Sequence, residues 1–276
     1  MTNQEVMQIL QEGMDKICSS REFQGYLKLS TCFPSYSSRN TLLIYTQCPQ
    51  ATLVCGFQAW KKLNRHVKKG SRALRILAPC RTLVENEDGQ KEEVITRFRP
   101  VSVFDISQTE GEPLAGADFY PRTLEGDVPH YEKILEALGR LTDFRIVFAP
   151  LEGCNGRCSY LDRTIAIRQV RSQMQTIKTL LHEIGHAMLH GFELDPASNA
   201  FHLHLQQNPD CKEIEAESVA FLTCYKCLGI DSQDFSFAYI AGYKKNHAFL
   251  EESLKRIMDC FSRISRKLEP MLEEIL

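Results

Sequence analysis

The spacing of apolar residues changes about halfway along the chain. In the first part, short apolar runs of strand composition alternate with turn residues, and a β-hairpin is expected within residues 81–98, with Asp88 and Gly89 in its turn. From residue 129 onward, apolar residues recur mainly at helical spacing. This pattern predicts four long helices, at residues 130–141, 176–191, 210–230 and 247–272.

A segment rich in Gly, Pro and acidic residues separates these two parts, at residues 108–129. Such a composition is typical of a linker between domains. We therefore expect an α+β protein with two domains. A small mixed α/β module would span residues 1–110, a linker 111–128, and a mainly helical domain 129–276.

The sharpest chemical signal is the pentapeptide His182-Glu183-Ile184-Gly185-His186 within one predicted helix. Two His four residues apart stand on one helical face and can bind one Zn²⁺. Glu183 between them would act as the general base, taking the proton of a water whose pKa the zinc lowers to about 7. This pattern predicts a zincin-like hydrolase; a helix that carries two surface histidines by chance is the alternative.

A catalytic zinc site needs a third protein ligand. Phe192 stands where one class of zinc peptidases has a third His, and His190 cannot converge with two histidines on a straight helix, so we expect it to support or pack against the site. The next helix offers Glu213 and Glu217, four residues apart on one face. We assign Glu213 as the ligand and Glu217 as the partner of a ligand histidine; the reverse assignment stays open.

Other residues near this site have weaker signals. Residues 163–168 could form an edge strand that pairs with an extended substrate, or a plain structural strand. Tyr239 and Tyr243 are candidates to stabilise an oxyanion, although core packing is the better interpretation of both. Cys224 and Cys227 could join Cys154 and Cys158 in a second metal site, but buried thiols are the better interpretation.

Charge is strongly segregated along the chain. Between Phe23 and Val84 there is no acidic residue and there are ten Lys or Arg, so this segment carries +10 within a chain of net charge −2. A solvated basic face is one explanation; single-stranded nucleic acid binding, with aromatic rings stacking on bases, is the other. Trp60 could instead be a core anchor. The candidate DNA-binding residues are Arg39, Trp60, Lys61, Lys62, Arg65, Lys68, Lys69 and Arg72.

The composition indicates a globular protein of the cytoplasm. No apolar run approaches the roughly 18–20 residues that a membrane span needs, so we expect no membrane association. The first residues lack the pattern of a secretory signal. Eleven Cys at irregular spacing are then expected to be mostly reduced thiols.

Several motifs together resemble a known family. They include Asn40 in an SxRN step, Gly56-Phe57-x-x-Trp60, Lys69-Gly70 and Phe104-Asp105-x-x-Gln108-Thr109. This part resembles the N-terminal single-stranded-DNA-binding domain of ArdC-like antirestriction proteins. The rest is similar to the zinc metallopeptidase-like domain of that family and to ImmA/IrrE-type peptidases. The resemblance implies a protein of a mobile genetic element that binds single-stranded DNA and shields it from restriction.

Three functions remain open at this point. The first is an antirestriction-type protein that binds single-stranded DNA and has a zinc-dependent peptidase acting on a peptide or protein. The second is a DNA-binding factor without enzymatic activity, in which zinc only stiffens the C-terminal domain. The third is a regulatory peptidase that cleaves one repressor.

Overall fold

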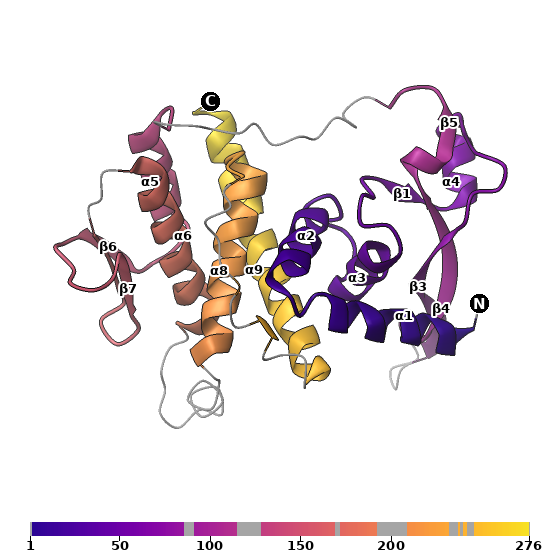
Figure 1. Cartoon of the computed structure of the whole chain (residues 1–276), viewed down its shortest axis with the longest axis horizontal. Coiled ribbons are helices and arrows are strands. Elements are labelled where there is room, and N and C mark those ends of the chain that lie inside the picture. Colours follow the sequence, from indigo (N-terminus) through magenta and orange to yellow (C-terminus); the bar gives the residue numbers. More distant parts are fainter. Residues whose placement is uncertain are drawn as a thin grey trace. The chain divides into compact units, whose positions relative to one another are not determined.

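Figure 1 shows the computed structural model of the chain, which describes residues 2–85, 91–114, 128–168, 172–191, 209–231, 237, 240–241 and 246–275. The described residues form both helices and strands, so the mixed class expected from the sequence is confirmed. Internal contacts divide the chain into two compact units. Unit 1 comprises Met1–Ile17 and Cys32–Phe119, and unit 2 comprises Cys18–Thr31 and Tyr120–Leu276.

Unit 1 combines three helices with short strands and one long hairpin. Its helices are α1 (Asn3–Lys16), α3 (Ser38–Gln47) and α4 (Phe57–Lys62), followed by the 3₁₀ turn η1 (Ile106–Gln108). Its strands are β1 (Val54–Cys55), β2 (Arg65–Val67), β3 (Leu74–Glu85), β4 (Lys91–Asp105) and β5 (Thr109–Gly111). The predicted hairpin is confirmed, because β3 and β4 pair antiparallel; its turn lies outside the described residues.

The strands of unit 1 form two small sheets. One has the order β1-β4-β3, and the other consists of β2 and β5. Strand β2 precedes the turn at Lys69-Gly70 and β3 follows it, but β2 pairs with β5 rather than with β3. Gly70 has a φ of +86°, a backbone conformation that favours glycine in such a turn.

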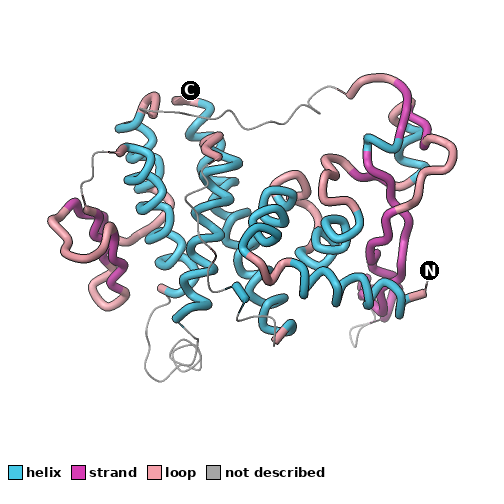
Figure 2. Tube along the Cα trace, in the orientation of Figure 1, coloured by secondary structure: helices cyan, strands magenta, loops and turns pink. Residues whose placement is uncertain are grey.

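Unit 2 consists of a helical layer and a small three-stranded sheet (Figure 2). Its helices are α2 (Ser20–Ser30), α5 (Tyr131–Gly139), α6 (Gln173–His190), α8 (Pro209–Cys227) and α9 (His247–Glu273). Its strands are β6 (Arg145–Phe148), β7 (Gly156–Ser159) and β8 (Thr164–Ile167), in the order β6-β8-β7. Of the described helices, none is long and apolar enough to cross a membrane.

Helix α2 belongs to unit 2, although the sequence analysis assigned all of residues 1–110 to one domain. The physical reason is an aromatic cluster in which Phe237 lies 5.0 Å from Phe23 of α2 and 6.0 Å from Phe221 of α8, between ring centroids. Lys28 also forms an ion pair of 2.7 Å with Asp231. Charge and composition along the chain do not reveal that an early helix has its apolar partners two hundred residues later.

Helices α6 and α8 pack closely where Gly185 faces Ala216. A methyl group built on Gly185 would lie 3.1 Å from both the Cα and the carbonyl oxygen of Ala216, which is tighter than an ordinary contact. Gly185 is the fourth residue of the histidine motif, and Ala216 lies beside Glu213, Glu215 and Glu217 on α8. The small residues therefore bring two sets of polar side chains within reach of each other.

We expect Gly185→Ala to lower the free energy of unfolding by about 1–2 kcal/mol, because the added methyl group overpacks against a backbone that cannot rotate away. The matched control is Gly139→Ala in α5, where the new methyl group would meet only the Ile146 side chain at 3.7 Å. That control should be neutral or stabilising, since Ala favours a helix over Gly. Urea denaturation of both variants measures the difference; equal stability of the two would contradict the close approach.

Candidate functional site

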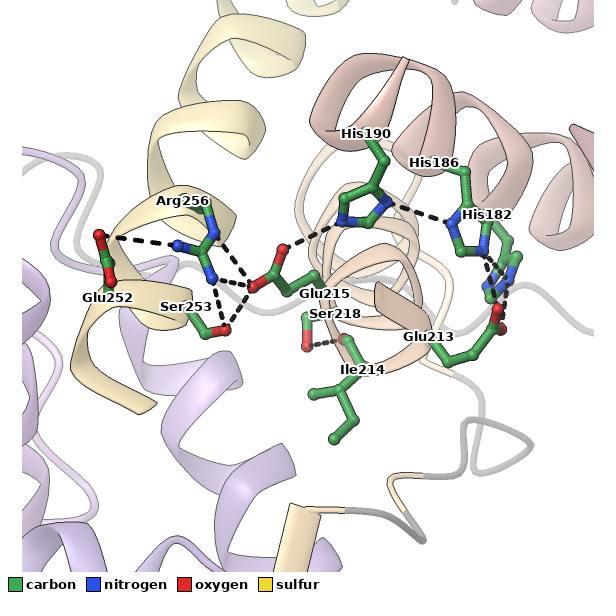
Figure 3. Close-up of polar contacts among 10 residues, drawn as sticks. All are labelled: His182, His186, His190, Glu213, Ile214, Glu215, Ser218, Glu252, Ser253 and Arg256. Carbon is green, nitrogen blue, oxygen red and sulfur yellow. Dashed lines mark hydrogen bonds and ion pairs between the residues drawn. The ribbon is translucent and has the colours of Figure 1, made fainter. Parts of the chain in front are cut away.

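The two histidines of the motif lie on the face of α6 that packs against α8. They are one helical turn apart, and both rings point toward Glu213 on α8 (Figure 3). Nε2 of His182 and Nε2 of His186 are 3.0 Å apart, and each is 3.3 Å from a carboxylate oxygen of Glu213. Potential metal-ligating atoms of three side chains, from two helices, thus lie close together.

This arrangement fits a divalent metal ion. Zinc bonds of about 2.0–2.1 Å in a tetrahedron place neighbouring ligand atoms about 3.3 Å apart, close to the three separations given above. In the part of the chain that the structure describes, His182, His186 and Glu213 are also the group of potential ligands close enough together to hold a metal. Two imidazoles and one carboxylate leave a position free for water or substrate, as catalytic metal sites require.

Glu217 contacts the outer nitrogen of His182. Its Oε2 lies 2.9 Å from Nδ1 of His182, and its Oε1 lies 3.4 Å from Nζ of Lys178. A carboxylate at Nδ1 accepts the hydrogen there and so leaves Nε2 with its lone pair toward the other ligands. The geometry therefore places Glu213 among the ligand atoms and Glu217 behind one of them.

Burial and carboxylates oppose each other at His182. Burial favours the neutral ring, but hydrogen bonds with Glu213 and Glu217 outweigh it and raise the pKa of His182 to about 9. The same contacts with the two histidines hold the pKa of Glu213 well below its ordinary value. Protonation of His182 and ionisation of Glu213 therefore favour each other.

Glu183 lies against strand β7 at the side of the site. It is only 7% exposed, and a methyl group built on Gly156 would come within 2.5 Å of its Oε1. Burial raises the pKa of the Glu183 carboxyl, while the charges of His182 and His186 oppose the rise. Only a glycine at position 156 of β7 leaves room for the carboxylate of Glu183 beside the strand.

A cavity of about 480 Å³ opens over the three ligand residues and Glu183. One wall consists of α6 side chains, and the opposite wall consists of β7 and the residues beside it. Besides the three candidate ligands, Glu183 and Glu217, the cavity is lined by Asn155, Gly156, Arg157, Cys158, Tyr160, Gln175, Lys178 and Thr179.

The structure decides between the two interpretations of residues 163–168. Strand β8 lies in the middle of the sheet, with β6 and β7 on its two sides, so it is the plain structural strand. Strand β7 is the edge that lines the cavity. Periodicity marks a strand but not its order in a sheet, so only tertiary pairing separates the two interpretations.

Two further side chains line the cavity: Cys158, which the sequence suggested only for a second metal site, and Tyr160, which the sequence did not single out. Burial and the nearby Glu183 raise the pKa of Cys158 to about 12, so its thiol is neutral and not a nucleophile. Burial, with the charges of Glu183 and Glu213, also raises the pKa of Tyr160, which keeps its hydroxyl protonated and able to donate. Tyr239 and Tyr243, the tyrosines considered from sequence, lie outside the described residues.

The cysteines do not form a second metal site among the described residues. Cys224 is fully buried in α8, and burial raises the pKa of Cys227 to about 12, so both are neutral thiols. Cys154 and Cys158 are free as well. The interpretation as packed thiols is therefore the one that agrees with the structure.

The candidate DNA-binding residues separate into exposed and buried ones. For two of them the prediction was wrong. Trp60 is fully buried, and its Nε1 donates to the carbonyl of Phe104 at 2.9 Å. Arg65 is also buried, and its guanidinium donates to Thr109 and to the carbonyl of Glu112. Neither is free to meet DNA. Arg39 is half-buried, and the exposed cations are Lys61, Lys62, Lys68, Lys69 and Arg72.

An exposed aromatic ring lies beside one of these cations, Lys61. Phe57 begins α4, is 47% exposed, and has Nζ of Lys61 5.7 Å from its ring centroid. The sequence shows an aromatic residue here but not that it is Phe57, rather than Trp60, that reaches the surface. We name the group of Phe57, Lys61, Lys62, Lys68, Lys69 and Arg72 the basic surface.

Known proteins resemble this chain in sequence and fold. Residues 4–104 match the family model of the N-terminal domain of anti-restriction factor ArdC. The uncharacterized protein pXO2-81 of Bacillus anthracis is 24% identical over 93% of this chain, which spans about half the length of that curated relative.

The fold is similar to two crystal structures of the antirestriction protein ArdC from plasmid R388. The Mn(II)-bound structure has a TM-score of 0.62 and 18% identity, covering 97% of this chain and 99% of that one. The metal-free structure has a TM-score of 0.59 and 16% identity, covering 87% of this chain and 86% of that one. At these identities the comparison shows a shared fold.

Metal binding should weaken as the pH falls, because the cation must displace the proton that His182 holds below about pH 9. We expect the apparent affinity for Zn²⁺ to fall about tenfold for each pH unit between pH 8 and pH 6, as one proton is exchanged. Competition with a chelator of known pH dependence measures it. An affinity that does not change over this range would contradict the proton held by His182.

Proposed function

We propose that unit 2 hydrolyses peptide bonds with a divalent cation held by His182, His186 and Glu213. The observation that carries this proposal is the convergence of two imidazole nitrogens and a carboxylate, 3.0–3.3 Å apart, beside the buried carboxylate of Glu183. Zinc is the cation that this set of nitrogen and oxygen ligands suits best, although Mn²⁺ also accepts such ligands.

When bound, the cation would supply Lewis acidity to the water and to the substrate carbonyl. Glu183 has the position of the general base, because its carboxylate borders the same cavity without belonging to the ligand group. It takes a proton from the attacking water at a carboxylate oxygen and returns it to the leaving amine. The raised pKa of its carboxyl suits a group that must both accept and release a proton near neutral pH.

Strand β7 offers the means to hold an extended peptide. It is an edge strand at the cavity, so a substrate backbone can add to it as another strand. Gly156 keeps the approach open, and Tyr160 supplies a protonated hydroxyl that can donate to the developing oxyanion. These features favour a peptide or protein over a small substrate.

Glu183→Gln should retain the metal and abolish hydrolysis. The amide has nearly the same shape but cannot accept the proton, and loss of a general base lowers kcat about 10²–10⁴-fold. A labelled unstructured protein or peptide library, with metal content measured alongside, tests this. The matched control is Glu132→Gln, at an exposed position of helix α5. This variant should cleave the substrate like the wild type. Unchanged cleavage by Glu183→Gln would contradict the mechanism.

We further propose that the chain acts as an ArdC-like antirestriction factor whose unit 1 binds single-stranded DNA. The basic surface supports this proposal, since five exposed cations accompany the exposed ring of Phe57. Cations of this kind neutralise phosphates, and an aromatic ring stacks on bases of any identity. The match of residues 4–104 to the anti-restriction family adds the biological context.

The double change Lys61→Ala and Lys62→Ala should weaken binding of a labelled oligonucleotide. Removing two phosphate contacts should also reduce the slope of log affinity against log salt concentration by about 1.4. Fluorescence anisotropy at several salt concentrations gives both quantities, and Lys133→Ala in unit 2 is the control that should change neither. A wild-type affinity that is independent of salt would overturn the DNA-binding proposal. Restriction protection that survives Glu183→Gln would favour the DNA-binding function as the one that protects.

A further inference from the structure

A carboxylate lies fully buried behind the metal-binding residues. Glu215 of α8 is 0% exposed, and four groups contact it: Nε2 of His190 at 3.1 Å, the hydroxyl of Ser253, and two nitrogens of Arg256 at 2.6 and 3.1 Å. A buried carboxylate is costly unless it is paired and hydrogen-bonded. Here Arg256 of α9 supplies the opposite charge and Ser253 a further donor, so Glu215 is held as a carboxylate.

His190 connects this carboxylate to the metal-binding histidine. It is 1% exposed, and its Nδ1 lies 3.3 Å from Nδ1 of His186, on the side of that ring away from the other ligands (Figure 3). The chain of contacts therefore runs from α9 through α8 to α6, in the order Arg256, Glu215, His190, His186. In Figure 3 a dashed line joins each of these residues to the next.

The direction of the hydrogen bonds follows from the carboxylate. A carboxylate only accepts, so the hydrogen between Glu215 and His190 belongs to Nε2 of His190. The charge of Glu215 is already balanced by Arg256, so the buried ring of His190 stays neutral and its Nδ1 accepts. The hydrogen between the two histidines then belongs to Nδ1 of His186, which leaves the lone pair of Nε2 facing His182 and Glu213.

We propose that His190 is a positioning residue that, anchored by Glu215 and Arg256, fixes the tautomer and the ring orientation of His186 for metal binding. The two ligand histidines are then supported differently: His182 directly by Glu217, and His186 through a second histidine whose support comes from α9. The proposal rests on the metal site of the proposed function, but not on whether peptide bonds are cleaved.

The spacing of the histidines alone does not predict this role for His190. His190 is one turn beyond His186 on the same helix, where it would most simply pack or bind the metal itself. The structure instead turns its Nδ1 toward the outer nitrogen of His186 and its Nε2 toward Glu215. Among the described residues, His190 is absent from the group whose ligand atoms converge.

The test uses Co²⁺ as the probe with two substitutions in the full-length chain. His190→Phe keeps a ring of similar size but removes both polar contacts. His190→Asn places a carbonyl oxygen where Nδ1 was, so it can still accept the hydrogen of His186. His66→Phe, at an exposed position of unit 1, is the matched control. Chelator competition gives the affinity for Co²⁺, its visible absorption reports the ligand geometry, and circular dichroism checks folding.

We expect His190→Phe to bind Co²⁺ about 10–100-fold more weakly, with an altered visible spectrum, because the orienting partner of a ligand is lost. His190→Asn should recover most of that loss, and His66→Phe should bind like the wild type. Unchanged affinity and spectrum in a folded His190→Phe variant would overturn the proposal. Equal losses in both His190 variants would also overturn it, since packing alone would then explain them.

The outcomes separate this proposal from the proposed function. A wild type that binds Co²⁺ with the expected order of variants, yet cleaves no peptide with Zn²⁺, would refute hydrolysis and support the role of His190. A wild type that binds no Co²⁺ would refute the metal site and with it the role of His190.

Discussion

The close approach of α6 and α8 at Gly185 and Ala216 is the constraint on which the functional site depends. Each helix alone presents polar side chains at helical spacing, and neither has three ligands for a metal. The absence of a side chain at Gly185 lets the two backbones come near enough for Glu213 to reach both histidines. A second glycine has a similar effect on the other side, where Gly156 leaves room for the carboxylate of Glu183.

The packing of α6 against α8 also determines which partner each glutamate of α8 contacts. Three glutamates on α8 have three different environments: Glu213 is half-exposed among the ligand atoms, Glu217 contacts His182 and Lys178, and Glu215 is fully buried with Arg256. Hydrogen bonds from His190, Arg256 and Ser253 overcome burial and keep the pKa of Glu215 below its ordinary value. Glu215 is therefore tolerated in the core of unit 2 because its partners lie on the neighbouring helices α6 and α9.

In unit 1 the same logic of burial separates candidate residues that look alike in sequence. Trp60 and Arg65 are buried, with their donors directed to backbone carbonyls and to Thr109, whereas Lys61 and Lys62, which directly follow Trp60, are exposed. The exposed ring of Phe57 beside Lys61 joins the apolar and cationic chemistry that single strands require. The proposed functions thus fall on separate units, with binding of a polyanion proposed for unit 1 and binding of a metal proposed for unit 2.

Local patterns in the sequence determined the elements and the residue types of the site. The period of the apolar residues predicted α6, α8, α9 and the hairpin of β3 and β4, because these depend on neighbours along the chain. The four-residue spacing of His182 and His186, and of Glu213 and Glu217, likewise places each pair on one helical face. Tertiary structure alone decided which strand is the edge at the cavity, that α2 packs in unit 2, and that His190 contacts Glu215, which in turn pairs with Arg256. These contacts join residues far apart in sequence, and they depend on packing distances that no local period encodes.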